Sequence, residues 1–316
     1  MEKIQRNVLL APFTTFKIGG LAKFFVVAES EKDLKEICLW AKKDNIPTFI
    51  LGGGSNILFS DNGFDGLVIK INFKEKEPQF QGNKVYANAG LPLSSLLSDA
   101  VKHGLSGLEW AIGIPGTIGG AVCGNTGAFG KDISDCVYNV KVFNCDDFSI
   151  TNLNNEDCDF YYRGSVFKNS RNLIVLGAEF ILQPKERDII QQKIRENIKQ
   201  RTSSFNHNSN CAGCFFKNVE WKRKDINKER LLKNFPELKK FADKPKISTG
   251  FLIDNLGLKN KKVGDAIVSN DHASFVLNLG NAKAEHVIML VGLIKQRVYN
   301  KYGFGLEEEV QLIGFD

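Results

Sequence analysis

The chain has 316 residues, of which 43% are hydrophobic and 25% charged, and it carries a formal net charge of +6 with a pI near 8.8. This composition excludes a disordered or fibrous protein and favours two or three globular domains. The N-terminus lacks a signal peptide's apolar region and no apolar run reaches the length of a membrane span, so we expect a cytoplasmic protein without a membrane partner. The seven scattered cysteines are expected to be reduced thiols.

The first half of the chain predicts a helix and two strand-rich stretches. Ser30 can cap a helix over residues 31–43, whose apolar residues share one face. The segment "IPTFILGGGSNILF" and the following "GLVIKI" predict a strand, a tight loop and further strand. A second unit begins with the strand "KVYANAG" and a helix through "SSLLSDAVKHG" that stops near Gly104.

The second half predicts alternating helices and strands. The segments "VYNVKVFN" and "LIVLGAEFIL" are typical of strands, and a helix is expected near residues 186–200. The polar stretch "RTSSFNHNSN" predicts a domain boundary. A long helix from Ala282 to about Tyr299, capped by Asn281, precedes a final strand "EEEVQLIGF". The pattern as a whole predicts an α+β fold.

Two glycine-rich stretches indicate a binding site for a long, phosphate-containing ligand. The first, "LGGGSN" at residues 51–56, can aim backbone N–H groups at phosphate oxygens, although an ordinary tight turn is about as probable for it alone. The second has seven glycines between Gly113 and Gly130. Close contact between backbone elements could explain it. Together, the two stretches favour a dinucleotide such as FAD.

The segment "SNCAGCFFKN" contains two cysteines, Cys211 and Cys214, that allow three interpretations. A zinc site would need two further ligands, of which His207 could supply one. A redox dithiol would favour a helix opening after a strand. The third possibility is one reactive thiol beside an inert one.

Seven motifs in order resemble the UDP-N-acetylenolpyruvoylglucosamine reductase family of peptidoglycan synthesis. They are "TTFKIGG", "LGGGSNIL", "GLEWAIGIPGTIGGAVCGNTGAFG", "YYRGSVFK", "AGCFFKN", "GFLIDNLGLK" with "VGDAIVSNDHASFVLN", and "LEEEVQLIG". The resemblance implies a two-part FAD-binding region of the PCMH-like type, over residues 1–72 and 73–203. A smaller α/β substrate-binding domain would follow at 204–316, with the C-terminal strand returning to the active site.

The resemblance also implies the reaction and its cofactors. NADPH, the co-substrate, would reduce noncovalently bound FAD, and the reduced flavin would then convert the enolpyruvyl ether of a UDP sugar to UDP-N-acetylmuramate. The partner is thus a small-molecule substrate, and neither nucleic acid nor metal is expected. A monomer is compatible with the sequence, which does not fix the oligomeric state.

Three residues match the catalytic positions of the family. Arg163, in "YYRGS", would bind the substrate carboxylate, and Glu309 would act as an acid near the developing enolate. Glu307 is the fallback, since strand alternation puts it on the same side as Glu309. Cys214 stands where many members carry the proton-donating serine. Its thiol, mostly protonated at neutral pH, can take that role.

The binding residues also follow from the resemblance, and they are listed here together. Expected at the cofactor are Gly52, Gly53, Gly54, Ser55, Asn56, Pro115, Gly116, Thr117, Gly119, Gly120 and Gly127, and at the substrate Tyr162, Lys217 and Asn218. Val219 departs from the proline that usually follows "FKN". His272 lies at a polar position near the substrate, but a single histidine is more often structural.

Two other interpretations remain at this point. One is another FAD-dependent oxidoreductase, such as an oxidase, with Cys123 as the candidate for a covalent flavin bond. The other is a non-catalytic metal-binding or nucleic-acid-binding protein, suggested by the cysteine pair and the positive charge.

Overall fold

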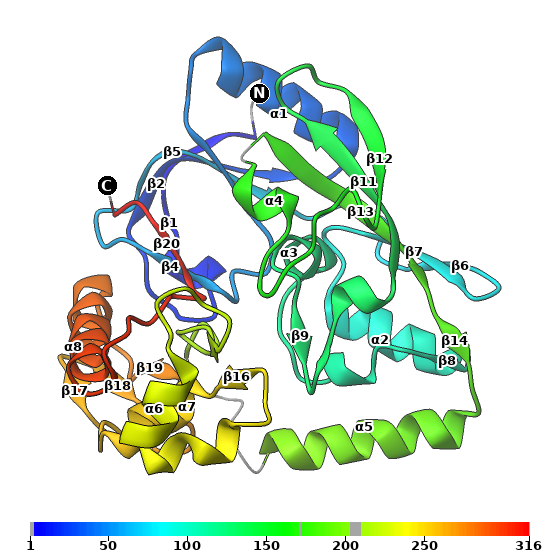
Figure 1. Cartoon of the computed structure of the whole chain (residues 1–316). Coiled ribbons are helices and arrows are strands. Elements are labelled where there is room, and N and C mark those ends of the chain that lie inside the picture. Colours follow the sequence, from blue (N-terminus) through cyan, green and yellow to red (C-terminus); the bar gives the residue numbers. More distant parts are fainter. Residues whose placement is uncertain (1–2, 171, 203–209, 316) are drawn as a thin grey trace. The chain divides into compact units, whose positions relative to one another are not determined.

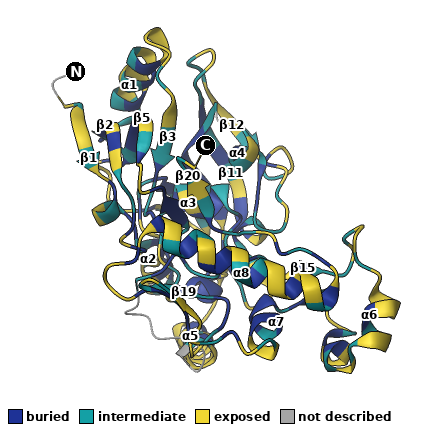
Figure 2. Ribbon diagram, turned by 90° about the vertical axis from the view of Figure 1, so that its left-hand side faces the viewer, coloured by how far each residue is buried: buried dark blue, intermediate teal, exposed yellow. Residues whose placement is uncertain are grey.

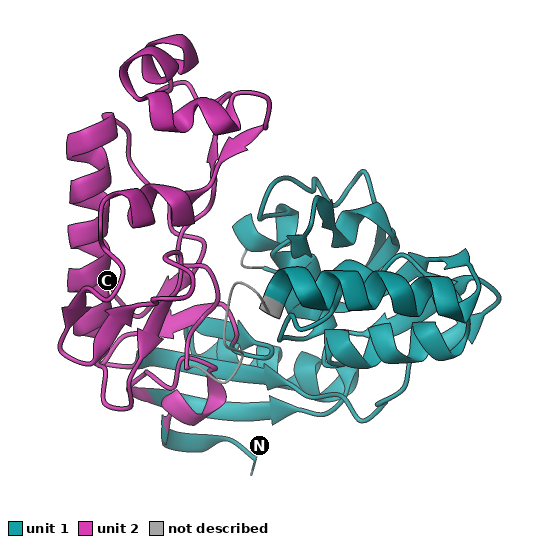
Figure 3. Cartoon of the chain, turned by 90° about the horizontal axis from the view of Figure 1, so that it is seen from below, with its two compact units in different colours: residues 1–8, 22–54, 64–203 teal, residues 9–21, 55–63, 204–316 magenta. Residues whose placement is uncertain are grey.

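The structure is a computed structural model that describes residues 3–170, 172–202 and 210–315, and the chain forms two compact units (Figure 1, Figure 3). Unit 1 comprises Met1–Val8, Ala22–Gly54 and Phe64–Ser203, and unit 2 comprises Leu9–Leu21, Ser55–Gly63 and Ser204–Asp316. The polar stretch in which we expected a domain boundary lies largely at 203–209, outside the described residues, and His207 lies there too.

Unit 1 contains a four-stranded sheet with the order β1-β2-β5-β3. Its strands are β1 (Gln5–Leu9), β2 (Leu21–Ala28), β3 (Thr48–Leu51) and β5 (Phe64–Ile71). Both β2 and β3 pair with β5 in parallel. Parallel strands need a crossover connection, because the chain must return to the same end of the sheet before the next strand begins. Helix α1 (Glu31–Lys43) makes the connection from β2 to β3 at the predicted residues, and the predicted cap is confirmed because Ser30 Oγ accepts the Asp33 N–H.

The second sheet of unit 1 is antiparallel, with the order β12-β11-β13-β7-β6. It contains β6 (Gln79–Gln81), β7 (Lys84–Asn88), β11 (Val137–Asn144), β12 (Ile150–Asn154) and β13 (Leu173–Ile181). Strands β7, β11 and β13 lie in segments predicted as strands, whereas β6 and β12 were not predicted. Two short pairs complete the strands of the unit, β8 (Leu105–Ser106) with β14 (Gln183–Pro184) and β9 (Gly127–Ala128) with β10 (Lys131–Asp132).

The remaining helices of unit 1 are α2 (Leu93–Lys102), α3 (Ile118–Cys123), α4 (Val166–Asn169) and α5 (Arg187–Thr202). One hydrophobic core extends from β2 and β5 through α2 and α3 to β11 and β13. In α5, Ile194 packs against this core and Ile190 is buried, whereas Ile189 is 52% exposed. The helix therefore buries a narrow stripe, and most of its described residues are exposed.

In its described residues, unit 2 contains short strands and three α-helices around a second core. The strands are β4 (Ile57–Phe59) with β20 (Gln311–Ile313), β15 (Val219–Glu220) with β16 (Lys246–Ile247), and the sheet β17 (Lys262–Val263), β18 (Ala266–Val268) and β19 (Val276–Asn278). The helices are α6 (Lys228–Asn234), α7 (Thr249–Asn255) and α8 (Ala284–Tyr302). The parallel pairing of β20 with β4 brings the end of the chain beside residues 57–59. The predicted final strand is thereby shortened to three residues.

Helix α8 packs one face into the core of unit 2 and exposes the other (Figure 2). The prediction that Asn281 caps it is wrong, since the helix begins at Ala284. Its first two N–H groups are instead bound by a distant residue: Asp61 Oδ1 accepts from Ala284 at 2.9 Å and Asp61 Oδ2 accepts from Glu285 at 3.0 Å. A carboxylate at this end also opposes the positive end of the helix dipole. No helix in the described part of the chain is long and apolar enough to cross a membrane.

Candidate active site

The two glycine-rich stretches of the sequence meet inside unit 1. A Cβ atom on Gly52 would lie 2.6 Å from Thr117 Oγ1, and one on Gly53 would lie 2.8 Å from Gly116 Cα. Both distances are too short for a side chain, so this approach requires glycine at both positions. Gly54 has a φ of +64°, a left-handed conformation that also favours glycine. Close packing between the stretches therefore explains part of the glycine content.

The junction of the two glycine-rich stretches contains a buried polar atom that lacks a hydrogen-bond partner among the described residues. Thr117 is the N-cap of α3, and its buried Oγ1 has no hydrogen-bond partner among the described residues. Leaving a buried hydroxyl unpaired costs about 1–3 kcal/mol, so such an atom points to a missing polar ligand. Phosphate oxygens or a ring carbonyl would satisfy it. The residues at this junction therefore fit the dinucleotide expected from the sequence.

The other glycines of the second stretch have different surroundings. Gly119 donates its N–H to the carbonyl of Ala89 at 2.9 Å, and a Cβ there would lie 2.9 Å from Ala89 Cβ. Gly120 has room for a Cβ, whose nearest neighbour would be Thr117 Oγ1 at 3.7 Å. Pro115 lies in the irregular segment before α3, and Gly127 begins β9.

A lysine that contacts the first glycine-rich loop was not predicted as a site residue. Lys70, in the otherwise apolar strand β5, donates from Nζ to the carbonyl of Gly52 at 3.2 Å. Burial lowers its pKa. In the sequence, Lys70 is a single lysine in the strand "GLVIKI". A lysine at such a position is equally compatible with a side chain that faces solvent. Its ammonium adds positive charge next to a loop suited to phosphate.

Arg163 lies at the tip of a tight turn in unit 1. Tyr161 and Gly164 bond each other's backbone at 3.0 and 3.1 Å, and Arg163 between them has a φ of +62°. That conformation is uncommon for a non-glycine residue and points to a constrained, functional position. Arg163 Nη2 donates to the carbonyl of Gly127 at 2.8 Å, and its guanidinium lies over the ring of Tyr162 at 5.3 Å. The predicted arginine is thus hydrogen-bonded to the second glycine-rich stretch.

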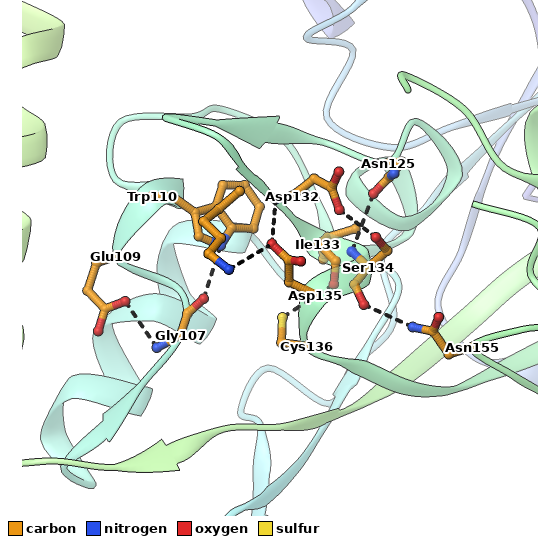
Figure 4. A network of polar contacts seen from close by, with 11 residues as sticks. Gly107, Glu109, Trp110, Asn125, Asp132, Ile133, Ser134, Asp135, Cys136 and Asn155 are labelled. Carbon is orange, nitrogen blue, oxygen red and sulfur yellow. Dashed lines mark hydrogen bonds and ion pairs between the residues drawn. The ribbon is translucent and has the colours of Figure 1, made fainter. Parts of the chain in front are cut away.

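Asn125 supports this turn and belongs to a network of polar contacts with Ser134 and Asn155, which Figure 4 shows. Asn125, only 3% exposed, donates to the carbonyl of Tyr161 at 3.0 Å and accepts the N–H of Ser134 at 3.3 Å. Asn155 in turn donates to the carbonyl of Ser134 at 2.9 Å. Asn125 was not predicted, because an asparagine within a glycine-rich loop is common. Its two bonds fix the Arg163 turn relative to the segment after α3.

Cys214 lies in an extended segment of unit 2 between two neighbouring segments. It forms an isolated bridge with Phe275, and the next residue, Phe215, donates its N–H to Ser274 at 2.7 Å. On the other side, the carbonyl of Phe215 accepts the N–H of Glu309 at 2.8 Å. No helix begins at the cysteine pair, which disfavours a redox dithiol. The arrangement brings Cys214 and Glu309 onto paired segments of one unit.

The three glutamates before β20 have different environments. Glu307 pairs with Lys217 and Arg223, each at 3.5 Å, and Glu308 pairs with Lys295 at 2.7 Å. The backbone of Glu309 is held at both ends, since its carbonyl accepts the side-chain N–H of Asn56 at 3.0 Å. Glu307, the alternative to Glu309 in the sequence, thus takes part in ion pairs with two basic residues.

The expected substrate residues Lys217 and Asn218 follow Phe216 in the same segment. Asn218 Oδ1 accepts the N–H of Thr249 at 3.1 Å, at the start of α7. Lys217 donates its backbone N–H to Glu307 at 2.9 Å. Burial lowers the pKa of His272, whose ring contacts Phe275 edge-on at 5.2 Å.

The two thiols that favoured other functions are protonated at neutral pH. Burial raises the pKa of Cys211, and it raises the pKa of Cys123 to about 11. A thiol must lose its proton to attack a flavin or bind a metal. Among the described residues, no group of three or more His, Cys, Asp or Glu side chains is placed to hold a metal ion.

Two family models match this chain. The model described as "FAD binding domain" matches residues 22–150, and the model described as "UDP-N-acetylenolpyruvoylglucosamine reductase, C-terminal domain" matches residues 205–313. The first covers both glycine stretches. The second covers Cys214 and Glu309.

Relatives match over nearly the full chain. The UDP-N-acetylenolpyruvoylglucosamine reductase of Synechococcus sp. (strain JA-3-3Ab) is 35% identical over 99% of this chain and 92% of its own length. The enzyme of the same name from Caldicellulosiruptor bescii is 37% identical over 96% and 89%. The crystal structure of the reductase from Thermus caldophilus matches with a TM-score of 0.78 and 31% identity over 98% of each chain. The chain therefore belongs to the UDP-N-acetylenolpyruvoylglucosamine reductase family.

Proposed function

We propose that the protein is an FAD-dependent reductase that converts UDP-N-acetylglucosamine enolpyruvate to UDP-N-acetylmuramate. The observation that carries this proposal is the pairing of the Cys214 and Glu309 segments through Phe215 in a chain of this family. The reaction adds a hydride to one carbon of a double bond and a proton to the other. A protein performing it needs a hydride carrier, a group that binds the carboxylate, and a proton donor.

The cofactor site we propose is the junction of the two glycine-rich stretches. The hydroxyl of Thr117 and the backbone around Gly52, Gly53 and Gly116 support this assignment. The proposed set is completed by Gly54, Ser55, Asn56, Pro115, Gly119, Gly120 and Gly127. FAD bound there supplies hydride chemistry that no side chain can perform.

The other steps of the reaction are assigned to three residues, namely Arg163, Glu309 and Cys214. Hydride addition to the outer carbon of the enolpyruvyl group develops negative charge on the carbon bearing the carboxylate. Arg163 binds that carboxylate through its guanidinium fork, a geometry that lysine lacks. Glu309 stabilises the developing enolate as an acid, and Cys214 donates the proton to carbon.

Other parts of the assignment concern the substrate and the second cofactor. Tyr162, Lys217 and Asn218 would bind the substrate, with Lys217 contributing positive charge for its diphosphate. NADPH would be the source of the hydride. We also propose a division into FAD-binding parts over 1–72 and 73–203 and a substrate-binding domain over 204–316, with the C-terminal strand returning to the active site.

An anaerobic experiment tests the proposed function. NADPH is added to the yellow protein and the loss of flavin absorbance is followed, and then the enolpyruvyl UDP sugar is added. The substrate should reoxidise the flavin with stoichiometric formation of UDP-N-acetylmuramate. Reoxidation by oxygen alone, with no effect of the enolpyruvyl substrate, would contradict the proposal.

The flavin should be released when the protein is denatured. Cys123, the candidate for covalent attachment, is a protonated and partly buried thiol at neutral pH. Precipitating the protein with acid should leave the yellow colour in the supernatant, which absorbance measures directly. Flavin that stays with the precipitate would instead favour the covalent attachment found in many oxidases.

Replacing Gly53 with alanine should weaken FAD binding. The new Cβ would lie 2.8 Å from backbone Cα of Gly116, so one of the two stretches must move. Overpacking of this kind costs about 1–3 kcal/mol, which corresponds to about a fivefold to a hundredfold increase in Kd for FAD. The measurement is fluorescence titration of the apoprotein with FAD.

Gly292→Ala in α8 is the matched control for this substitution. A Cβ at Gly292 would meet nothing within 4 Å, and alanine favours a helix. Its FAD affinity should equal that of the wild type. Equal FAD affinity in Gly53→Ala would show that the junction is not the cofactor site.

A further inference from the structure

Asn56 joins the first glycine-rich loop to Glu309. Its side-chain Nδ2 donates to the backbone carbonyl of Glu309 at 3.0 Å, and its own carbonyl accepts the N–H of Gln311 at 3.0 Å. The parallel ladder of β4 with β20 begins at the next pair, Ile57 with Gln311. Asn56 therefore binds the C-terminal segment on both sides of Val310.

The opposite side of the same segment is bound by the residue after Cys214. The carbonyl of Phe215 accepts the N–H of Glu309 at 2.8 Å. The N–H of Glu309 and its carbonyl are thus both fixed, one by the Cys214 segment and the other by Asn56. Side-chain torsions are the principal freedom left to the Glu309 carboxyl, and a catalytic group needs this kind of support.

We infer that Asn56 is a positioning residue for Glu309, acting through the backbone carbonyl of that glutamate. This inference rests on the proposed function, which gives Glu309 its role. Asn56, the last residue of the "GGGSN" loop, would thus contribute to reoxidation of the flavin by the substrate, in addition to any contact with FAD. The amide is suited to it because it donates while carrying no charge that would disturb the carboxyl.

Two substitutions test the inference. Asn56→Ala removes the donor, and Asn56→Asp keeps the shape while placing an acceptor against the carbonyl of Glu309. Loss of one hydrogen bond corresponds to about a threefold to tenfold change in rate. Reoxidation of the reduced flavin by the enolpyruvyl substrate should slow by this factor in Asn56→Ala and by more in Asn56→Asp. Because Asn56 also belongs to the proposed FAD site, reduction by NADPH can change too, but reoxidation should slow by the larger factor in both variants.

The matched control is Lys295→Met, which removes the ion pair of the neighbouring Glu308 without touching the backbone of Glu309. Stopped-flow absorbance gives both half-reactions for each variant, and the pH dependence of reoxidation reports the essential acid. The pH profile should shift in both Asn56 variants and stay unchanged in Lys295→Met.

Three outcomes would overturn the inference: equal slowing of both half-reactions, loss of FAD without a specific effect on reoxidation, or a wild-type rate and pH profile in both Asn56 variants. Failure of the proposed function is distinguishable from these. In that case the wild-type protein itself would not be reoxidised by the enolpyruvyl substrate.

A separate observation concerns two thiols in unit 1. Cys38 in α1 and Cys145, directly after β11, have their sulfur atoms 3.9 Å apart (Figure 1 locates both elements). Cys38 is 6% exposed and Cys145 is partly exposed. Lys42 lies beside them, with Nζ donating to the carbonyl of Cys145 at 3.4 Å. The shared hydrogen bond with Cys38 and the Lys42 ammonium lower the pKa of Cys145.

We propose that Cys38 and Cys145 form a disulfide when a small-molecule disulfide reaches Cys145. The Cys145 thiolate attacks one sulfur of the reagent and expels the first thiolate. The hydrogen bond to Cys145 and burial raise the pKa of Cys38, so Cys38 loses its proton as its sulfur attacks Cys145 Sγ and expels the second thiolate. Two protein thiols lose two protons and two electrons, and the reagent is reduced to two thiols. The sulfur atoms must approach by about 2 Å, which side-chain rotation can supply.

Treatment with oxidised glutathione followed by peptide mass spectrometry tests this site. The wild type should yield a peptide pair linked through Cys38 and Cys145, and Cys38→Ser should trap a mixed disulfide on Cys145. Cys145→Ser should give neither product. The buried Cys158 provides an internal reference that should remain a free thiol. A link between Cys211 and Cys214 in place of the Cys38 link, or an unmodified Cys145, would overturn the proposal.

Discussion

Arg163→Lys and Glu309→Gln should slow reoxidation of the flavin by the enolpyruvyl substrate about a hundredfold or more, and leave reduction by NADPH nearly unchanged. Both side chains act on charge that develops only when the substrate accepts hydride. Removing such a stabilising group commonly costs a factor of this size. Lysine keeps the charge of Arg163 but lacks its bidentate fork. Glutamine keeps the shape of Glu309 but lacks its acidity.

Two control variants distinguish loss of the Arg163 guanidinium from distortion of the turn that contains it. The φ of +62° at Arg163 is tolerated well by asparagine, so Arg163→Asn should keep the turn and still lose reoxidation. Arg6→Lys, at an arginine that lies 5.0 Å over the ring of Phe24, should behave as wild type. Stopped-flow absorbance measures both half-reactions. If reduction by NADPH falls as far as reoxidation in both Arg163→Lys and Glu309→Gln, the assigned roles are wrong.

The sequence predicted α1, α2, α5 and the strands β3, β5, β7, β11 and β13 of unit 1 because their signals are local, whereas β1, β2, β6 and β12 were not predicted. Ser30 and the apolar spacing after it suffice to define α1. The cap of α8 could not be found in the same way. Asn281 is a good local candidate, whereas Asp61, which binds the helix start, lies 223 residues away in the chain. Long-range pairing of this kind leaves no pattern in a single sequence.

The candidate site shows the same difference between local sequence signals and long-range contacts. Glycine content and motif resemblance pointed to the loops and to Arg163, Cys214 and Glu309. The supporting residues were missed, because Lys70, Asn125 and the link from Asn56 to Glu309 depend on contacts between distant segments. A polar residue in a loop or strand has many ordinary explanations until its partner is known.

Cys214→Ala should lose most turnover while the flavin is still reduced by NADPH. The thiol is the proposed proton donor to the carbon that bears the carboxylate, and loss of a general acid typically costs about a factor of 10² to 10⁴. The pairing of residue 214 with Phe275 and the bond from Glu309 to Phe215 use backbone atoms, so alanine should preserve them. Steady-state turnover and the two half-reactions are the measurements.

The neighbouring cysteine gives the sharpest control for this prediction. Burial raises the pKa of Cys211, and its carbonyl accepts the hydroxyl of Thr15 at 2.6 Å, so its contribution is to packing and backbone position. Cys211→Ala should be nearly normal, and Cys214→Ser should keep a useful part of the activity because a hydroxyl can also donate a proton. A fully active Cys214→Ala would remove Cys214 from the mechanism. Stoichiometric zinc that is lost together with activity would instead assign the two cysteines to a metal site, so metal analysis of the purified protein completes the test.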